Sequence, residues 1–230
     1  MGGQPRTAGA ARLTEPRWLF GGEAVLDVAP DAPTLWLFDI DDAATRRRAE
    51  AVAPLPQEAA LFAARYDAGR RWLRHRLARL LLAAAGSCRP DRVVIGRTAA
   101  GAPVVVTPAG WYLSVAGRWP HCLVGIAPLP LGVDLERIER DQPVPPDLLT
   151  GAEREALALT AGGDRPRFFA RAWAAKESHA KWTGAPRAVE PAVVETGVAF
   201  VRSPWGTTRC WSVEVGEFVA AACGGHREER

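Results

Sequence analysis

The chain has 230 residues, of which 48% are hydrophobic and 24% charged, and its formal net charge at pH 7 is +3. This composition is typical of an ordinary globular protein with a sizeable core, in one large domain or two small ones. The small net charge gives no argument for nucleic-acid binding, and no apolar run approaches the roughly 20 residues of a membrane span. The four cysteines form no C-x-x-C pair and no disulfide framework, so we expect reduced thiols in a cytoplasmic protein.

The first third of the chain predicts a short sheet followed by a long helix. Residues 1–16 are rich in Gly, Ala and Pro and lack the apolar segment of a secretory signal, so we expect them to be disordered. Strand-like runs follow at 18–28 and 35–40. The pattern at 57–85 is helical, with a break near 67–69. Its second half has leucines on one side and arginines largely on the other, which form either a solvated helix face or an anion-binding surface.

The rest of the chain is a succession of short strand-like runs interrupted by two helices. Strands are expected at 92–96, 103–107, 111–116, 122–127, 131–138, 193–195, 198–201, 208–215 and 217–222, and helices at 152–159 and 164–184. Each half of the chain therefore pairs a small, mostly antiparallel sheet with one long helix. We expect an α+β fold of two similar halves packed side by side, 17–118 and 119–225.

The helix that ends at Gly184 holds both lysines of the chain, Lys176 and Lys181, among 29 lysines and arginines. Asp164 is its predicted N-cap, and Gly184 its stop signal. Because the chain uses arginine everywhere else, the two lysines suggest a need for a compact ammonium that can donate a proton. Glu177 and Lys181, spaced i, i+4, project from one face. On spacing alone they are either part of a site or a surface salt bridge worth about 0.3–0.5 kcal/mol.

Two carboxylates alternate with apolar residues in the segment LGVDLERI. Asp134 and Glu136 lie on one face of the predicted strand, and Val133 and Leu135 on the other. Two like charges side by side are unfavourable unless a cation lies between them. A hard divalent cation such as Mg²⁺, which binds carboxylate oxygens, would meet that need. The alternative is an exposed face whose charges are balanced by the arginines that follow in the chain.

The segment GVDLERI, followed about 40 residues further on by WAAKESHAK, resembles the paired signature of the 4′-phosphopantetheinyl transferases. The likeness is to the single-chain, Sfp-like type, and it also takes in Arg70, the turn at 101–103 and the segment LSVAGRW, over roughly residues 55–185. It implies two halves related by a pseudo-twofold axis. It also implies an enzyme that moves phosphopantetheine from coenzyme A to a serine of a carrier protein and leaves adenosine 3′,5′-bisphosphate.

The resemblance assigns roles to particular residues. The implied Mg²⁺ ligands are Asp134, Glu136 and Glu177, the implied catalytic residues are Glu177 and Lys181, and the implied coenzyme A site contains Arg70, Ser114 and Arg65. Attack of a serine hydroxyl on a pyrophosphate needs neutralised phosphates and an acid for the leaving oxygen. Glu177 suits the role of base, directly or through a metal-bound water, and Lys181, one turn further, that of acid.

The chain departs from the family pattern at its coenzyme A pocket. The family usually shows Ser-His-Ser and Gly-Lys-Pro where this chain has Ser-Val-Ala at 114–116 and Gly-Ala-Pro at 101–103. Val115 and Ala102 thus stand where a histidine and a lysine would face the phosphates. The pocket is therefore divergent from the family pattern. Each lost charge-assisted bond costs about 1.5–3 kcal/mol, so we expect the two changes to weaken coenzyme A binding.

The sequence therefore indicates two possible functions. One is phosphopantetheinyl transfer to an acyl or peptidyl carrier protein, with coenzyme A as substrate, by a monomer that binds neither nucleic acid nor membrane. The other is a recruited family member with lost or changed coenzyme A use, either a non-catalytic carrier-protein-binding module or an enzyme on a different substrate. Nucleic-acid binding through the arginine-rich helix is a weaker third interpretation, because that helix lacks interleaved exposed aromatic residues.

Overall fold

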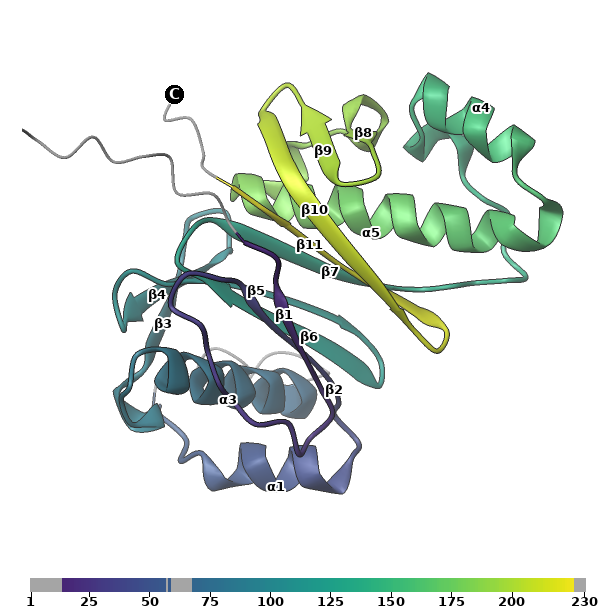
Figure 1. Cartoon of the computed structure of the whole chain (residues 1–230). Coiled ribbons are helices and arrows are strands. Elements are labelled where there is room, and N and C mark those ends of the chain that lie inside the picture. The colour runs from purple at the N-terminus through teal and green to yellow at the C-terminus, as the bar shows by residue number, and fades with distance from the viewer. Residues whose placement is uncertain (1–13, 57, 59–67, 226–230) are drawn as a thin grey trace, which may run out of the picture.

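The computed structural model describes residues 14–56, 58 and 68–225 of the chain (Figure 1). Its α-helices are α1 (Ala43–Ala51), α3 (Ala68–Ala85), α4 (Gly151–Leu159) and α5 (Arg165–Thr183). Its strands are β1 (Arg17–Phe20), β2 (Thr34–Asp39), β3 (Val94–Arg97), β4 (Pro103–Thr107), β5 (Tyr112–Arg118), β6 (His121–Ala127), β7 (Leu131–Arg137), β8 (Glu195–Thr196), β9 (Phe200–Ser203), β10 (Gly206–Val215) and β11 (Phe218–Gly224). None of the helices in the described ranges is long and apolar enough to cross a membrane. The fold is a mixed α+β fold, as expected.

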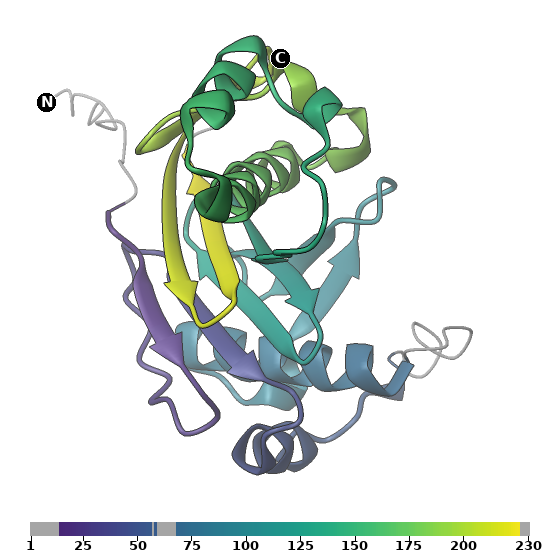
Figure 2. The same ribbon diagram turned by 90° about the vertical axis from the view of Figure 1, so that its right-hand side faces the viewer.

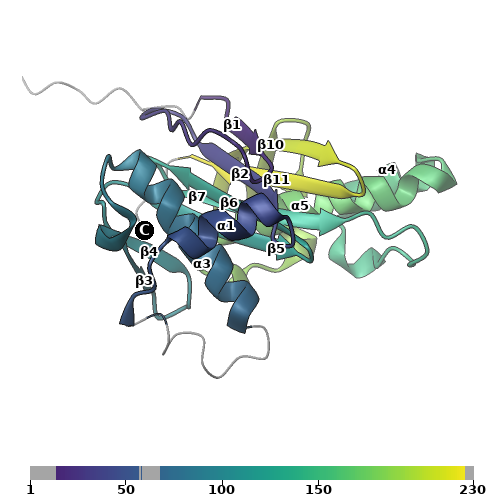
Figure 3. The same ribbon diagram turned by 90° about the horizontal axis from the view of Figure 1, so that it is seen from below.

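The first sheet has four strands in the order β1-β2-β6-β5, of which β1 and β2 run parallel and the other neighbours antiparallel. Helices α1 and α3 cover its outer face, as the view from below shows (Figure 3). Trp36 and Phe38 of β2 pack there with Leu77 and Leu81 of α3, and all four are almost fully buried. The leucine side of α3 is therefore its core side, as the periodicity predicts. The hairpin of β3 and β4 forms a separate two-stranded sheet.

The second sheet has five antiparallel strands in the order β7-β11-β10-β9-β8. One of its faces packs on the first sheet, where Val133 and Leu135 of β7 meet Leu35 of β2. Helix α5 covers the opposite face, as the view along this helix shows (Figure 2). Because side chains alternate along a strand, Asp134 and Glu136 lie on the α5 side of β7. The fold thus brings the acidic strand and the lysine helix into direct contact.

The ends of α5 agree with the sequence signals in position and differ in one contact. Gly184 ends the helix with a left-handed φ of 80°, a conformation that glycine adopts without steric cost. Asp164 occupies the N-cap position, but its carboxylate makes no bond to the helix backbone. The carboxylate pairs instead with Arg167, one turn along, at 3.3 Å. Asp164 is therefore the N-cap residue, as predicted, but its side chain pairs with Arg167 and not with the helix backbone.

Two segments of the first half differ from the expected elements. The strand expected at 18–28 is confirmed only as β1, because Gly21 takes a left-handed φ of 75° and turns the chain. Helix α1 is not among the expected elements. Asp42 caps it by accepting a hydrogen bond from the backbone N–H of Thr45 at 2.8 Å. Its buried residues are only alanines and a threonine, so its hydrophobic periodicity is weak. The first part of the helix expected at 57–85 lies outside the described residues.

The division of the chain into halves remains a prediction. Strand β6 belongs to the first sheet and ends at Ala127, beyond residue 118, whereas the second sheet begins at Leu131. The sheets also differ in strand number, and a parallel pair occurs only in the first. The pseudo-twofold relation is therefore an expectation that the strand order alone does not establish. The disorder expected for residues 1–16 falls almost entirely outside the described residues.

Gly132 is the point of closest approach between β7 and α5. A Cβ atom at this position would lie 1.9 Å from the carbonyl oxygen of Ser178 and 2.5 Å from the backbone nitrogen of Trp182. Both atoms belong to the backbone of α5, so no side chain can move aside to make room. Glycine at 132 is thus the residue that lets the helix seat on the strand.

We expect Gly132→Ala to lower the free energy of unfolding by about 1–3 kcal/mol or more, because the helix must move off the strand. Chemical denaturation of the variant and the wild type measures the difference. Gly96→Ala is the matched control, since a Cβ there would be in ordinary contact, 3.6 Å from Val106. The control should be neutral or stabilising by up to about 1 kcal/mol. Equal stability of Gly132→Ala and Gly96→Ala would contradict this role.

Candidate functional site

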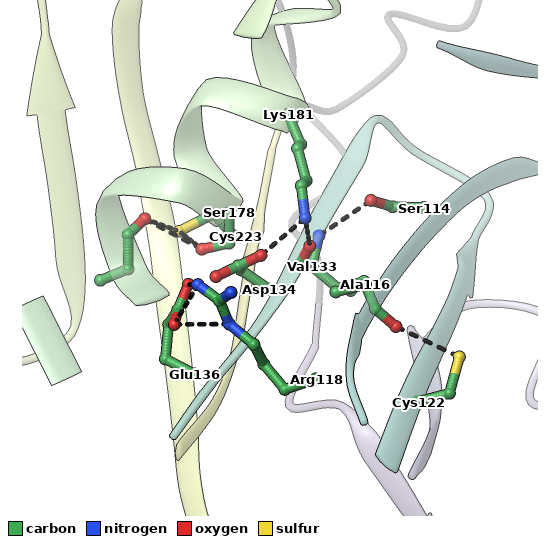
Figure 4. A network of polar contacts seen from close by, with 11 residues as sticks. Ser114, Ala116, Arg118, Cys122, Val133, Asp134, Glu136, Ser178, Lys181 and Cys223 are labelled. Carbon is green, nitrogen blue, oxygen red and sulfur yellow. Dashed lines mark hydrogen bonds and ion pairs between the residues drawn. The ribbon is translucent and has the colours of Figure 1, made fainter. Parts of the chain in front are cut away.

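The two carboxylates of β7 are buried and each is held by a cation. Asp134 is 6% exposed and Glu136 is 8% exposed. The ammonium of Lys181 donates to Asp134 Oδ1 at 2.6 Å and to the carbonyl oxygen of Val133 at 3.1 Å (Figure 4). The guanidinium of Arg118 donates to both oxygens of Glu136, at 2.9 and 2.7 Å. Two strand carboxylates are thus neutralised by one cation from α5 and one from β5.

These contacts exclude a surface salt bridge between Glu177 and Lys181, and they exclude an exposed face for the two carboxylates of β7. Lys181 reaches across to β7 instead of forming a surface pair with Glu177 on its own helix. The arginine that balances Glu136 is Arg118, far away in the sequence, whereas Arg137 pairs with the exposed carboxylate of Glu217. The carboxylates therefore belong to a buried, ordered cluster between β7, β5 and α5.

The cluster contains acids that are easier to protonate than free carboxylates. Burial, followed by the neighbouring charge of Asp134, raises the pKa of Glu136 to about 7, although Arg118 opposes the shift. Burial and then Asp134 also raise the pKa of Glu177, which is half-buried one turn before Lys181. A carboxylate with a raised pKa can accept a proton near neutral pH.

The donor set of the cluster fits a hard divalent cation in part. Asp134 Oδ2 is buried and has no hydrogen-bond partner among the described residues. Such an oxygen is costly to bury unless a ligand or ion meets it. Mg²⁺ usually takes one or two carboxylates and completes its shell with water and substrate phosphates. Asp134 and Glu136 satisfy that requirement.

Within residues 14–56, 58 and 68–225, however, no three side chains of His, Cys, Asp or Glu are grouped closely enough to hold a metal ion. The set of three ligands that includes Glu177 stays a prediction.

A cavity of about 650 Å³ opens on the other side of Lys181. It lies between α3, the β3–β4 hairpin, β5 and the end of α5, and its volume is in the range of about 300–1,000 Å³ typical of ligand sites. Its cationic lining consists of Arg71, Arg74, Arg97, Arg187 and Lys181. No carboxylate is found among the described residues that line it. Lys181 thus borders both the cavity and the acidic cluster, so an anion in the cavity would lie next to the two carboxylates.

The residues predicted to bind coenzyme A do not all lie at the cavity. Ser114 lines the cavity, but its hydroxyl accepts a hydrogen bond from the backbone N–H of Val133 at 3.0 Å. It therefore satisfies a backbone group on the free edge of β7, just as Lys181 satisfies the carbonyl of the same residue. Arg70 is exposed, and its guanidinium lies 3.3 Å from the ring centroid of Trp119. Arg70 is not among the described residues of the cavity lining, and Arg65 lies outside the described residues.

The arginines of α3 have three different surroundings. Arg79 is fully buried and pairs with Glu58 at 2.6 Å, while it also donates to the carbonyl oxygen of Pro90. Arg76 is 5% exposed and stacks on Trp72, with its guanidinium 3.5 Å from the ring centroid. A solvated helix face is therefore wrong for these two residues. Arg71 and Arg74 face the cavity instead, which fits the anion-binding interpretation for that part of the helix. Helical spacing alone does not separate these groups.

The second lysine of α5 has a structural surrounding. Lys176 is 1% exposed and pairs with Glu153 of α4 at 2.6 Å. Its ammonium also donates to the carbonyl oxygen of Pro191 at 2.8 Å. Glu153 is at the same time the acidic partner in the capping box of α4, with Thr150. Lys176 therefore fixes α4 against α5, and Lys181 is the lysine that lines the cavity of about 650 Å³.

Comparison with known proteins gives a family match to less than half of the chain. Residues 130–223 match the family described as the 4′-phosphopantetheinyl transferase superfamily, over a segment that contains β7 and α5 and ends within β11. The chain is also similar to the crystal structure of Thermotoga maritima holo-[acyl-carrier-protein] synthase (AcpS), at 16% identity and a TM-score of 0.34. That similarity covers 44% of this chain and 64% of the other, so less than two thirds of the synthase is spanned. No curated protein matches the chain. The family match supports a relationship of this segment to the superfamily.

Proposed function

We propose that the protein transfers the 4′-phosphopantetheine arm of coenzyme A to a serine of an acyl or peptidyl carrier protein and releases adenosine 3′,5′-bisphosphate. The observation that carries the proposal is the position of Lys181, which joins a cavity with five cationic side chains to a buried pair of carboxylates. The family match to residues 130–223 supports the same chemistry. The single-chain, Sfp-like character of the protein, its Mg²⁺ dependence and its carrier protein are part of the proposal.

The residues of the chain would divide the reaction between them. The arginines of the cavity would bind the nucleotide and phosphates of coenzyme A by charge-assisted hydrogen bonds. Lys181 would supply a proton or a positive charge to the oxygen that leaves. Glu177, with its raised pKa, would accept the proton of the attacking serine. Asp134 and Glu136, with Glu177 as the predicted third ligand, would hold a divalent cation, which neutralises phosphate charge when bound.

The direct test is a transfer assay. The protein is incubated with coenzyme A, Mg²⁺ and an apo carrier protein, and the intact mass of the carrier is measured. We expect the carrier to gain the mass of one phosphopantetheine arm. A carrier whose acceptor serine is replaced by alanine should gain nothing, and chelation of the metal should stop the transfer. An unmodified carrier, with several carrier types tried, would contradict transferase activity.

A recruited role without transfer is the second candidate, and one observation favours it. Both carboxylates of β7 already have a protein cation as partner, and the described residues gather no three-ligand metal cluster. In this case the carrier protein would still bind, or another anionic ligand would occupy the cavity. Calorimetry distinguishes the candidates: tight carrier binding without transfer indicates a binding module, and no binding of coenzyme A indicates a different substrate.

The altered positions of the cavity give a test of the ligand. Ala102 and Val115 both line the cavity, next to the space where phosphates would lie. We expect Ala102→Lys and Val115→His, made separately, each to tighten coenzyme A binding by about 1.5–3 kcal/mol, because each adds a charge-assisted hydrogen bond. Isothermal titration measures the change in Kd. Val25→Lys, an exposed site outside the cavity lining, adds the same charge and should leave Kd unchanged. No change in either cavity variant would favour another ligand.

A further inference from the structure

Two cysteines face each other across the β10–β11 hairpin. Cys210 of β10 is the direct register partner of Cys223 of β11. The backbone N–H of Cys210 donates to the carbonyl oxygen of Ala199, on the side of β10 away from β11, at 3.0 Å. Because the N–H and C=O of one strand residue point to the same side, Cys210 and Cys223 form a non-hydrogen-bonded pair. Such pairs have Cα atoms about 4.5 Å apart, within the range of about 4.4–6.8 Å that a disulfide allows.

The two thiols differ in access but share one environment under α5. Cys223 is fully buried, and its sulfur accepts a hydrogen bond from the hydroxyl of Ser178 at 3.0 Å (Figure 4). Cys210 is half-buried and lines a second cavity, of about 810 Å³, between α4, α5 and β10. Burial acts to raise the pKa of Cys223, but hydrogen bonds from Cys210, Ser178 and Thr208 lower it below its usual value. The hydrogen bond to Cys223 and burial raise the pKa of Cys210 well above its usual value. The pair therefore places one thiol at an entrance for a small oxidant and the second thiol directly opposite it.

We propose that Cys210 and Cys223 form a reversible cross-strand disulfide when the protein meets hydrogen peroxide. One sulfur attacks a peroxide oxygen and becomes a sulfenic acid, and the other peroxide oxygen leaves as water. The second thiol then attacks the sulfenic sulfur, so that the S–S bond forms and a second water leaves. The two thiols lose two electrons and two protons in total. A small thiol reverses the step by exchange through a mixed disulfide.

The crosslink would tie together two strands that lie directly under α5. Cys223 touches Ser178, the residue after Glu177, so the bond forms beside the helix that carries Glu177 and Lys181. The remaining cysteines provide an internal contrast. Cys122 is buried and donates to the carbonyl oxygen of Ala116 at 3.1 Å, and neither it nor Cys88 has a cysteine as its register partner among the described strands.

The test uses the full chain, reduced and then treated with hydrogen peroxide. We expect free thiols to fall from four to two per chain, and the intact mass to fall by two hydrogen atoms. Proteolysis should yield a peptide that links Cys210 to Cys223, and a dithiol reductant should restore both thiols.

Two variants control the assignment. The double variant Cys88→Ser/Cys122→Ser should keep the crosslink, and Cys210→Ser, at a half-buried position, should lose it. Peroxide treatment that leaves all thiols free would overturn the proposal. A loss of thiols that persists unchanged in Cys210→Ser, or oxidation of single cysteines to sulfinic acid without a linked peptide, would overturn it as well.

Discussion

Asp134→Ala is expected to lower the rate of phosphopantetheine transfer by at least about 10²–10³-fold, the loss typical when one preorganised charge-stabilising group is removed. The variant loses the only carboxylate of the cluster that has a buried oxygen without a partner among the described residues. It also frees Lys181 from its ion pair. The fold should persist, because the change relieves the repulsion between Asp134 and Glu136, and because the side chain of Lys181 is 26% exposed and can turn to water.

Steady-state kinetics with a carrier protein measures the effect, and thermal unfolding checks the fold. Titration with Mg²⁺ in the presence of coenzyme A adds a readout that does not depend on turnover. The matched control is Glu217→Ala, which removes an exposed carboxylate from the pair with Arg137, at the other end of β7 from the cavity lining. Exposed pairs contribute about 0–1 kcal/mol, so the control should keep full activity. Unchanged turnover of Asp134→Ala would remove Asp134 from the reaction.

Lys181→Arg is expected to lower turnover by about 10²–10⁴-fold, as for the loss of a general acid, and to move Tm very little. The substitution keeps the positive charge. However, a guanidinium with a pKa above about 12 does not give up a proton, and its planar fork is too wide for the place of a compact ammonium. In the structure that ammonium lies within 2.6 Å of Asp134 and 3.1 Å of the Val133 carbonyl while it borders the cavity.

Arg171→Lys is the matched control for this prediction, because it exchanges the same two residue types elsewhere on α5. Arg171 is exposed and pairs with Glu214 at 2.7 Å, outside the lining of the cavity next to Lys181. Its exchange should leave both turnover and Tm unchanged. Activity of Lys181→Arg within about twofold of wild type would reduce Lys181 to a positioning contact for β7, because only the ion pair would then be needed.

The elements around the site could be predicted from local patterns. Helix α5 has a stop signal at Gly184, and β7 has a strict alternation of acidic and apolar residues, so both were predictable with nearly their observed bounds. Helix α1 was not, because alanines and a threonine give it no hydrophobic stripe. The strand order of the two sheets is also a long-range property. Strand β6 pairs with its chain neighbour β5, but it also pairs with β2, which is far away in the sequence. Local patterns do not reveal that second pairing, which places β6 in the first sheet.

The ion-pair partners of the acidic residues could not be predicted from the sequence. The spacing places Glu177 and Lys181 on one face of a helix, but the ammonium bonds to Asp134, 47 residues away. Arg118 reaches Glu136 only because β5 lies beside the free edge of β7, where Ser114 also bonds to Val133. A signal for the cavity was present in the sequence, since Arg71 and Arg74 belong to the arginine-rich face of α3. Arg79 differs from Arg71 and Arg74 because it is buried in an ion pair with Glu58, and the helical periodicity of the sequence does not reveal that partner.

The stoichiometry of the transfer is the most direct measurement of the proposed activity. Carrier protein, coenzyme A and Mg²⁺ are mixed with a catalytic amount of the protein, and the adenosine 3′,5′-bisphosphate released is quantified beside the modified carrier. We expect one nucleotide for each carrier serine modified, over many turnovers, and release that is at least about 10²-fold slower with Lys181→Arg or Asp134→Ala. Coenzyme A that binds to the cavity but stays intact in the presence of a binding carrier protein would contradict the proposed activity.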